Sequence, residues 1–209
     1  LWDHIQLFEM DDVDGEGTTD WGQFGMRKDD GRYQWVIKKG HDKFGVIRTF
    51  SWPADLENVS PILVADRTAD GVRDVAITGT DKTTGRIFLR INDGKLPNTR
   101  IANMSWSANW ENQQVQELGD LNGDGFNEYA MLGYLKTNGT VQLVVKDGQS
   151  LTEYGRYTLM GDWDELMLSS YDVNADGNAD VMIGGLNKTT DAKVYTFLDG
   201  TNLEVLLIR

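Results

Sequence analysis

The sequence predicts an all-β fold, a β-propeller of four-stranded antiparallel blades with one blade for each of four repeats of about 52 residues. Three observations predict it. An acidic loop recurs at spacings of 54, 54 and 52 residues, two further turns keep the same step, and short β-rich runs lie between the turns. No segment shows a sustained helical period.

The acidic loop defines the repeat. Its copies are DVDGEGTTD (12–20), DRTADGVRD (66–74), DLNGDGFNE (120–128) and DVNADGNAD (172–180). A second turn ends at Gly31, Gly85, Gly139 and Asp191, and a third turn comprises Lys39-Gly40, Asp93-Gly94, Asp147-Gly148 and Asp199-Gly200. These landmarks predict a single repeat domain, 1–209, with blades at about 1–51, 52–105, 106–159 and 160–209.

The strands are clearest in the third repeat. The sequence predicts strands at 115–118, 129–135, 140–146 and 152–159. Val141, Leu143 and Val145 alternate with Gln142 and Val144, as expected of a mostly buried strand. Asp-Gly between two such runs is a strong hairpin signal. Each repeat is therefore predicted to be an antiparallel meander.

A lone four-stranded meander would leave both of its faces poorly covered, and stacking blades around an axis would bury them. Four blades are few for closure. Three arrangements stay open: a compact four-bladed ring, a homodimer in which two chains complete eight blades, and half of a larger propeller.

The acidic loops have the composition of metal sites. Their pattern is Asp-x-[Asp/Asn]-x-Asp-Gly-x-x-[Asp/Glu], in which positions 1, 3, 5 and 9 offer side-chain oxygens and position 7 a backbone carbonyl. Calcium takes six to eight oxygen ligands, and the glycine at position 6 permits the sharp turn that brings them together. Position 12 carries strand residues instead of the glutamate of an EF-hand, which excludes that motif.

The predicted calcium ligands are these positions in every copy: Asp12, Asp14, Glu16, Thr18 and Asp20; Asp66, Thr68, Asp70, Val72 and Asp74; Asp120, Asn122, Asp124, Phe126 and Glu128; Asp172, Asn174, Asp176, Asn178 and Asp180. The residues rank copies three and four as the strongest Ca²⁺ sites and copy one next. Copy two ranks last, because Thr68 stands at position 3 between two arginines. A plain Asx-rich turn without metal is the alternative, but clustered carboxylates repel one another unless a cation neutralises them.

Composition and charge argue against several classes of function. The formal net charge is −13 and the pI about 4.5, which argues against nucleic-acid binding. No apolar run is long enough to span a bilayer, so we expect no membrane insertion. The chain has no cysteine and shows no nucleophile elbow, phosphate loop or dinucleotide motif. Whether it is an enzyme stays open, with a non-catalytic role favoured.

GDLNGDGFNEYAMLG (119–133) and DVNADGNADVMIGG (172–185) resemble FG-GAP/VCBS-type repeats. Such repeats form the calcium-bearing propellers of integrin α-subunits and of many secreted bacterial proteins. The resemblance implies calcium at positions 1, 3, 5, 7 and 9 and a secreted or cell-surface location. It also implies adhesion or carbohydrate binding, with a protein or glycan ligand. Similar repeats occur in some polysaccharide lyases, so part of a lyase or hydrolase is an alternative, and a purely structural module is another.

Two tryptophans are candidate ligand-binding residues. Trp52 and Trp106 each lie 14 positions before an acidic loop, in Ser-Trp-Pro and Ser-Trp-Ser. If exposed, their rings would offer a flat face for a sugar. The alternative is blade packing. The two histidines, His4 and His41, belong to no metal motif, and we expect them to be surface or packing residues.

Overall fold

A computed structural model describes residues 1–96 and 99–209 of the chain. Within these residues it contains β-strands and one short 3₁₀ turn, η1 (Asp42–Phe44). The strands of the first two repeats are β1 (Trp2–Glu9), β2 (Trp21–Arg27), β3 (Tyr33–Lys38), β4 (Val46–Trp52), β5 (Leu56–Val64), β6 (Asp74–Asp81), β7 (Ile87–Asn92) and β8 (Arg100–Trp106). Those of the last two are β9 (Trp110–Glu117), β10 (Tyr129–Leu135), β11 (Val141–Lys146), β12 (Glu153–Leu159), β13 (Trp163–Tyr171), β14 (Asp180–Asn187), β15 (Ala192–Leu198) and β16 (Val205–Ile208).

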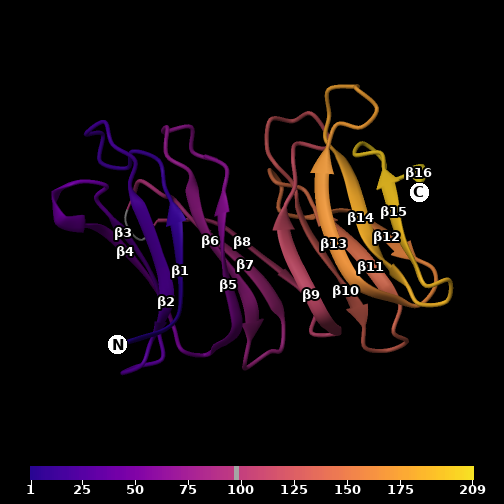
Figure 1. The fold of residues 1–209 in the computed structure, drawn as a ribbon, viewed down its shortest axis with the longest axis horizontal. Helices are drawn as coiled ribbons and strands as arrows, with labels where there is room; N and C mark the ends of the chain where they lie inside the picture. The colour runs from indigo at the N-terminus through magenta and orange to yellow at the C-terminus, as the bar shows by residue number, and fades with distance from the viewer. Residues whose placement is uncertain (97–98) are drawn as a thin grey trace. The chain divides into compact units, whose positions relative to one another are not determined.

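The strands form four separate four-stranded antiparallel sheets, each with its strands in chain order (Figure 1). We number the sheets one (β1–β4), two (β5–β8), three (β9–β12) and four (β13–β16). Every neighbouring pair is antiparallel, which is the pattern of a meander. The predicted all-β fold of four repeated sheets is confirmed.

In sheet three, β10 has the predicted bounds, whereas β9 begins at Trp110, five residues before the predicted start at 115. The prediction missed the start of β9 because the β9–β10 pairing shifts register next to Asn112, whose φ is 48°. Such a bulge breaks the alternation of buried and exposed residues from which a strand is recognised in sequence. His4, Asn58 and Glu165 occupy the same point of the other sheets, with φ of 54°, 51° and 49°.

The chain divides into two compact units, Leu1–Ala108 and Asn109–Arg209, each of two sheets. In the first unit, Phe24, Trp35 and Phe50 of sheet one pack in one core with Val75 and Ile77 of sheet two. The second unit has a matching core made by sheets three and four. Each sheet therefore covers one face of its neighbour, which is how two amphipathic sheets bury their apolar sides. Among the described residues, no helix is long and apolar enough to span a membrane.

Candidate metal centre

Each acidic loop joins the first strand of its sheet to the second. In all four loops the glycine at position 6 has a positive φ, between 87° and 94°, at Gly17, Gly71, Gly125 and Gly177. A side chain would be strained in this conformation. The sharp turn predicted for position 6 is present in every copy.

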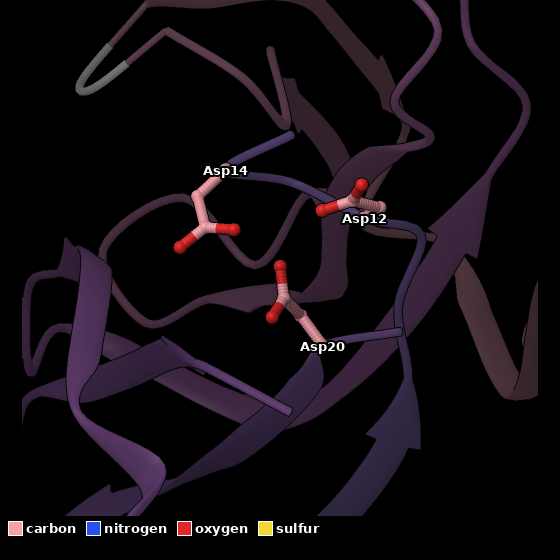
Figure 2. A group of neighbouring side chains, drawn as sticks. All are labelled: Asp12, Asp14 and Asp20. Carbon is pink, nitrogen blue, oxygen red and sulfur yellow. The ribbon is translucent and has the colours of Figure 1, made fainter. Parts of the chain in front are cut away.

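The aspartate at position 1 organises the loop around itself. In the first copy, Asp12 Oδ1 accepts hydrogen bonds from the backbone N–H groups of Gly15 and Glu16 at 2.9 and 3.0 Å, and Oδ2 accepts one from Gly17 at 2.7 Å. The position-6 amide makes the same bond in the other copies, at 2.7, 2.8 and 3.0 Å. These bonds curl the loop, and in the first copy Asp12 and Asp14 face the same point as Asp20 (Figure 2).

The carboxylate at position 9 fastens the loop to the rest of its sheet. Asp20 accepts a hydrogen bond from the Val13 amide at 2.8 Å and another from the Gly40 amide at 2.9 Å. Asp74, Glu128 and Asp180 make the equivalent pair of bonds. All four carboxylates are fully or almost fully buried. Each one ties the acidic loop to the third turn, twenty residues further along the chain.

The third turn requires glycine for a steric reason. A Cβ on Gly40, Gly94, Gly148 or Gly200 would lie 1.8 to 2.1 Å from the backbone carbonyl oxygen at position 8 of the loop. No real Cβ approaches an oxygen so closely, so only glycine allows the turn to donate its N–H to the position-9 carboxylate. In the sequence this glycine had indicated only a hairpin.

Carboxylates converge in two of the loops. Asp12, Asp14 and Asp20 each offer one oxygen in a group whose atoms all lie within 4.8 Å of one another, and Figure 2 shows the three carboxylates turned toward a common point. The second such group is Asp120, Asp124 and Glu128. Both triads could hold a metal ion. Their donors are oxygens only, which suits a hard cation such as Ca²⁺ or Mg²⁺ better than a thiolate- or imidazole-seeking metal.

Loops two and four contribute no such group among the described residues. In loop two the Thr68 hydroxyl donates to Asp66 at 3.2 Å. In loop four, Asp172 and Asp176 are exposed, and Asp176 accepts the Asn178 amide at 2.8 Å. Loop four was ranked with loop three from its residues, but only loop three brings its three carboxylates within that distance.

The residues at positions 3, 5 and 7 bond mainly within their own loops. In loop three, Asp124 Oδ1 accepts the Phe126 amide at 2.8 Å, and the Asn122 amide group donates to Asp147 of the third turn at 2.9 Å. Asp147 was not among the predicted ligands, although its place in the repeat beside Gly148 could have suggested it. Val72 donates its amide to Asp70 in loop two, the Asn174 side chain donates to Asp176 in loop four, and Thr18 contacts Glu16 in loop one.

Burial raises the pKa of two of the carboxyl groups at position 9. The pKa of Glu128 rises from 4.5 to about 7, because burial penalises its charge more than its two backbone hydrogen bonds stabilise it. The pKa of Asp74 rises from 3.8 to about 6 for the same reason. The neighbouring acids Asp124 and Asp120 push the Glu128 pKa further upward. A cation bound in loop three would reverse this effect, since it would favour the ionised form.

Loop one contains a cation of its own. Lys39 Nζ lies 3.0 Å from Asp14 Oδ2, and this hydrogen bond lowers the pKa of Asp14. His41 Nε2 contacts Glu16 on the other side of Gly40. The other three repeats carry an aspartate where Lys39 stands. An ammonium group at this point competes with any metal ion for Asp14.

The candidate sugar-stacking residues lie in the interior. Trp52 is 2% exposed and Trp106 4%, at the last positions of β4 and β8, where they pair with Tyr33 and Ile87. Neither indole presents a free face to a ligand, so the stacking role predicted for these two residues has no support from their placement.

Comparison with known family models and curated proteins does not assign the chain to a family. No family model matches the chain, and no curated protein matches it.

Proposed function

We propose that this protein is a non-catalytic, calcium-stabilised β-propeller module that acts outside the cell and binds a protein or glycan ligand. The observation that carries the proposal is the acidic loop, which has the same backbone hydrogen bonds in all four sheets and converging carboxylates in two of them. The sheets would be the blades, and the loops the points at which a cation fastens each blade.

Calcium fits the loops better than other cations for two reasons. The converging donors are carboxylates, and calcium accepts many oxygens in an irregular arrangement, whereas Mg²⁺ demands a near-ideal octahedron and keeps its waters. Extracellular modules also work with weak sites, at Kd values of about 10⁻⁴–10⁻³ M. Loops as exposed as these suit a medium in which calcium is plentiful.

The non-catalytic part of the proposal rests on how the acids are used. In each sheet, the position-1 and position-9 carboxylates accept backbone amides, which is a structural task. Within residues 1–96 and 99–209, the groups of three or more metal-capable side chains lie in loops one and three. Ligand binding would then fall to other surfaces of the sheets.

A calcium titration followed by a glycan array tests the proposal in two separable parts. Isothermal titration calorimetry of the chelator-stripped protein should show binding, with Asp124→Asn weakening the loop-three site and Asn138→Asp, in an exposed turn outside the loops, leaving it unchanged. The array is then run with calcium and with chelator. Absence of calcium binding refutes the calcium part, whereas calcium binding without any glycan signal leaves a protein ligand as the partner.

A further inference from the structure

A small hollow lies where β4 of sheet one meets β7 and β8 of sheet two. Its volume is about 190 Å³, and it is lined by Phe50, Ser51 and Trp52 of β4, by Asn92 at the end of β7 and by Arg100 at the start of β8. All five residues belong to the first compact unit. None of them is part of an acidic loop, so the hollow is distinct from the candidate metal centres.

Asn92 and Arg100 are neighbours across the sheet. They are directly paired in the β7–β8 register, and paired residues of antiparallel strands have their side chains on the same face. The pairs at the same place in the other three sheets are Lys38 with Val46, Lys146 with Glu153, and Leu198 with Val205. Among the four sheets, sheet two alone combines an amide with a guanidinium group here, so the repeat itself does not require this pair.

The Asn92 side chain has a hydrogen-bond acceptor that the described residues leave unused. Asn92 is 7% exposed, and its Oδ1 is buried without a partner within residues 1–96 and 99–209. Nearly all buried polar atoms in proteins have a partner, so an exception calls for a bound water or ligand. The amide oxygen and nitrogen occupy almost the same space, and a half-turn of the group presents Oδ1 to the hollow.

Arg100 places an unpaired positive charge beside this amide. Its side chain is exposed, and in the part of the chain that the structure describes it forms no ion pair. Arg90, two residues before Asn92, already has partners: Asp81 at 4.0 Å and the Phe88 ring, whose centroid lies 4.5 Å from its Cζ. Burial lowers the pKa of Arg90, and the charge of Arg100 lowers it further. A bound anion would relieve the repulsion between the two guanidinium groups.

Other contacts hold the walls of the hollow in place. Arg48 of β4 donates a hydrogen bond to the backbone carbonyl oxygen of Gly94, which ties the two sheets together near Asn92. The Asp93 amide donates to the Thr99 carbonyl oxygen at 2.9 Å, directly before β8 begins. The Asp93 carboxylate accepts two backbone amides of its own turn, at 2.7 and 2.6 Å. The backbone on both sides of the amide–guanidinium pair is therefore fixed.

These groups indicate what the hollow can bind. A guanidinium group binds a carboxylate through two parallel hydrogen bonds, and an unused amide oxygen needs a hydroxyl or amino donor. Phe50 and Trp52 are almost wholly buried, so they offer a solute little apolar surface. The volume lies below the roughly 300–1,000 Å³ of pockets for drug-sized ligands. The ligand should therefore be a single small unit that is polar and anionic.

We infer that this hollow binds a small hydroxycarboxylate, with Arg100 holding the carboxylate and Asn92 accepting a hydrogen bond from a hydroxyl group. Free hydroxy acids and the acidic sugar units of a glycan share this chemistry. The glycan source rests on the proposed function and deepens it, since it gives the class of glycan. The free acid does not depend on that function.

The test is an NMR titration of the ¹⁵N-labelled full chain in saturating calcium with three matched solutes. Glucuronate carries both a carboxylate and hydroxyl groups, glucose lacks the carboxylate, and cyclohexanecarboxylate lacks the hydroxyl groups. We expect glucuronate to shift the amide signals of Asn92 and Arg100, and the other two solutes to bind about tenfold more weakly or less. Absence of any shift with glucuronate overturns the site. Equal binding of glucose overturns the role of Arg100, and equal binding of cyclohexanecarboxylate overturns the role of Asn92.

Two variants and a control assign the residues. Arg100→Gln and Asn92→Leu should each weaken glucuronate binding by about tenfold or more. Asn92→Leu should melt no lower than the native chain, because sheet four packs the fully buried Leu198 at this place; a lower melting temperature would show that the amide is structural. Arg86→Gln removes the same charge at the other end of β7, about 20 Å away at roughly 3.3 Å per residue, and should bind as the native chain does. Unchanged glucuronate affinity of Arg100→Gln overturns the inference.

A glycan array separates the two sources of ligand, and it separates this inference from the proposed function. A signal that is confined to uronate-containing glycans and lost in Arg100→Gln assigns the site to a glycan. Glucuronate binding in the titration without any glycan signal assigns the site to a free hydroxy acid and counts only against the glycan part of the proposed function. A signal from neutral glycans that Arg100→Gln retains, together with no glucuronate binding, refutes this inference alone.

Discussion

Replacing Glu128 by Gln should change how stability depends on pH. With a pKa of about 7 in the folded protein and 4.5 as its ordinary value, Glu128 holds its proton more tightly when the chain is folded. Folding is therefore favoured by this group below pH 4.5, and that contribution is lost as the pH rises through 7. In full it corresponds to about 3.4 kcal/mol, at 1.36 kcal/mol for each pKa unit. About 2.5 kcal/mol of this falls between pH 5 and pH 8.

The glutamine side chain does not ionise, so Glu128→Gln should lack this pH dependence. At pH 5 the variant should be less stable than the native chain by about 1–3 kcal/mol, because its NH₂ group faces one of the amides of Leu121 and Gly148 and leaves it unpaired. At pH 8, in chelator, this difference should shrink by about 2.5 kcal/mol and can change sign. With saturating calcium, the native chain should regain its lead at pH 8.

Urea denaturation measures the difference in stability between Glu128→Gln and the native chain under four conditions, at pH 5 and pH 8, each with calcium and with chelator. Comparing the variant with the native chain removes the contribution of Asp74 and the other acids, which titrate alike in both. If the native chain and Glu128→Gln lose the same stability between pH 5 and pH 8 in chelator, loop three does not contain a buried, protonated carboxyl, and the assignment is refuted. An equal calcium gain in both chains would remove Glu128 from the metal site.

Three further outcomes are expected. Removing calcium should lower the melting temperature, since a site held at about 100 times its Kd adds roughly 2.7 kcal/mol, and a calorimetric scan with and without chelator that shows no shift would contradict this. Lys39→Met should tighten cation binding at loop one several-fold, because the ammonium group that competes with the metal ion for Asp14 is lost; calorimetry that finds unchanged affinity would count against it. Gly148→Ala should cost about 3 kcal/mol or more in urea melts, since its Cβ would lie 2.1 Å from the Asn127 carbonyl oxygen. Gly155→Ala, whose Cβ would meet only the Leu203 side chain at 2.9 Å, should cost clearly less, and equal costs would argue against the clash.

The sequence predicted the repeated sheets because the acidic loops, turns and strands recur at the same spacing. A mistake in the bounds of one strand does not change that spacing, so the repeat is recognised even where a strand is misplaced. It also predicted the curled loop, since glycine at position 6 and oxygen-bearing side chains at alternate positions leave few other conformations. Where the local pattern was broken, prediction failed. The bulge at Asn112 hid the first half of β9, because its extra residue breaks the alternation of buried and exposed residues by which a strand is recognised in sequence.

The candidate site was less accessible to sequence reasoning because its contacts are long-range. Lys39 reaches Asp14 from the third turn, 25 residues away, and only the fold shows that this ammonium enters the loop. Trp52 and Trp106 looked like the start of the second and third repeats, but each ends the last strand of the sheet before. There the indole turns into the core, so a residue that seemed free for a ligand is a packing residue.

The hydrogen bonds of the position-9 carboxylate bear on what calcium does for this protein. Asp20, Asp74, Glu128 and Asp180 are held by two backbone amides each, and these bonds exist whether or not the loop has a converging triad. Because these two bonds are common to all four loops, they cannot account for a difference between the loops in their response to calcium. The stabilisation by calcium should therefore depend on the net charge of the side chains around each loop. It should stabilise loop three most, because a buried carboxyl next to Asp124 and Asp120 gains most from a neighbouring positive charge, and loop one less, because Lys39 already supplies part of that charge.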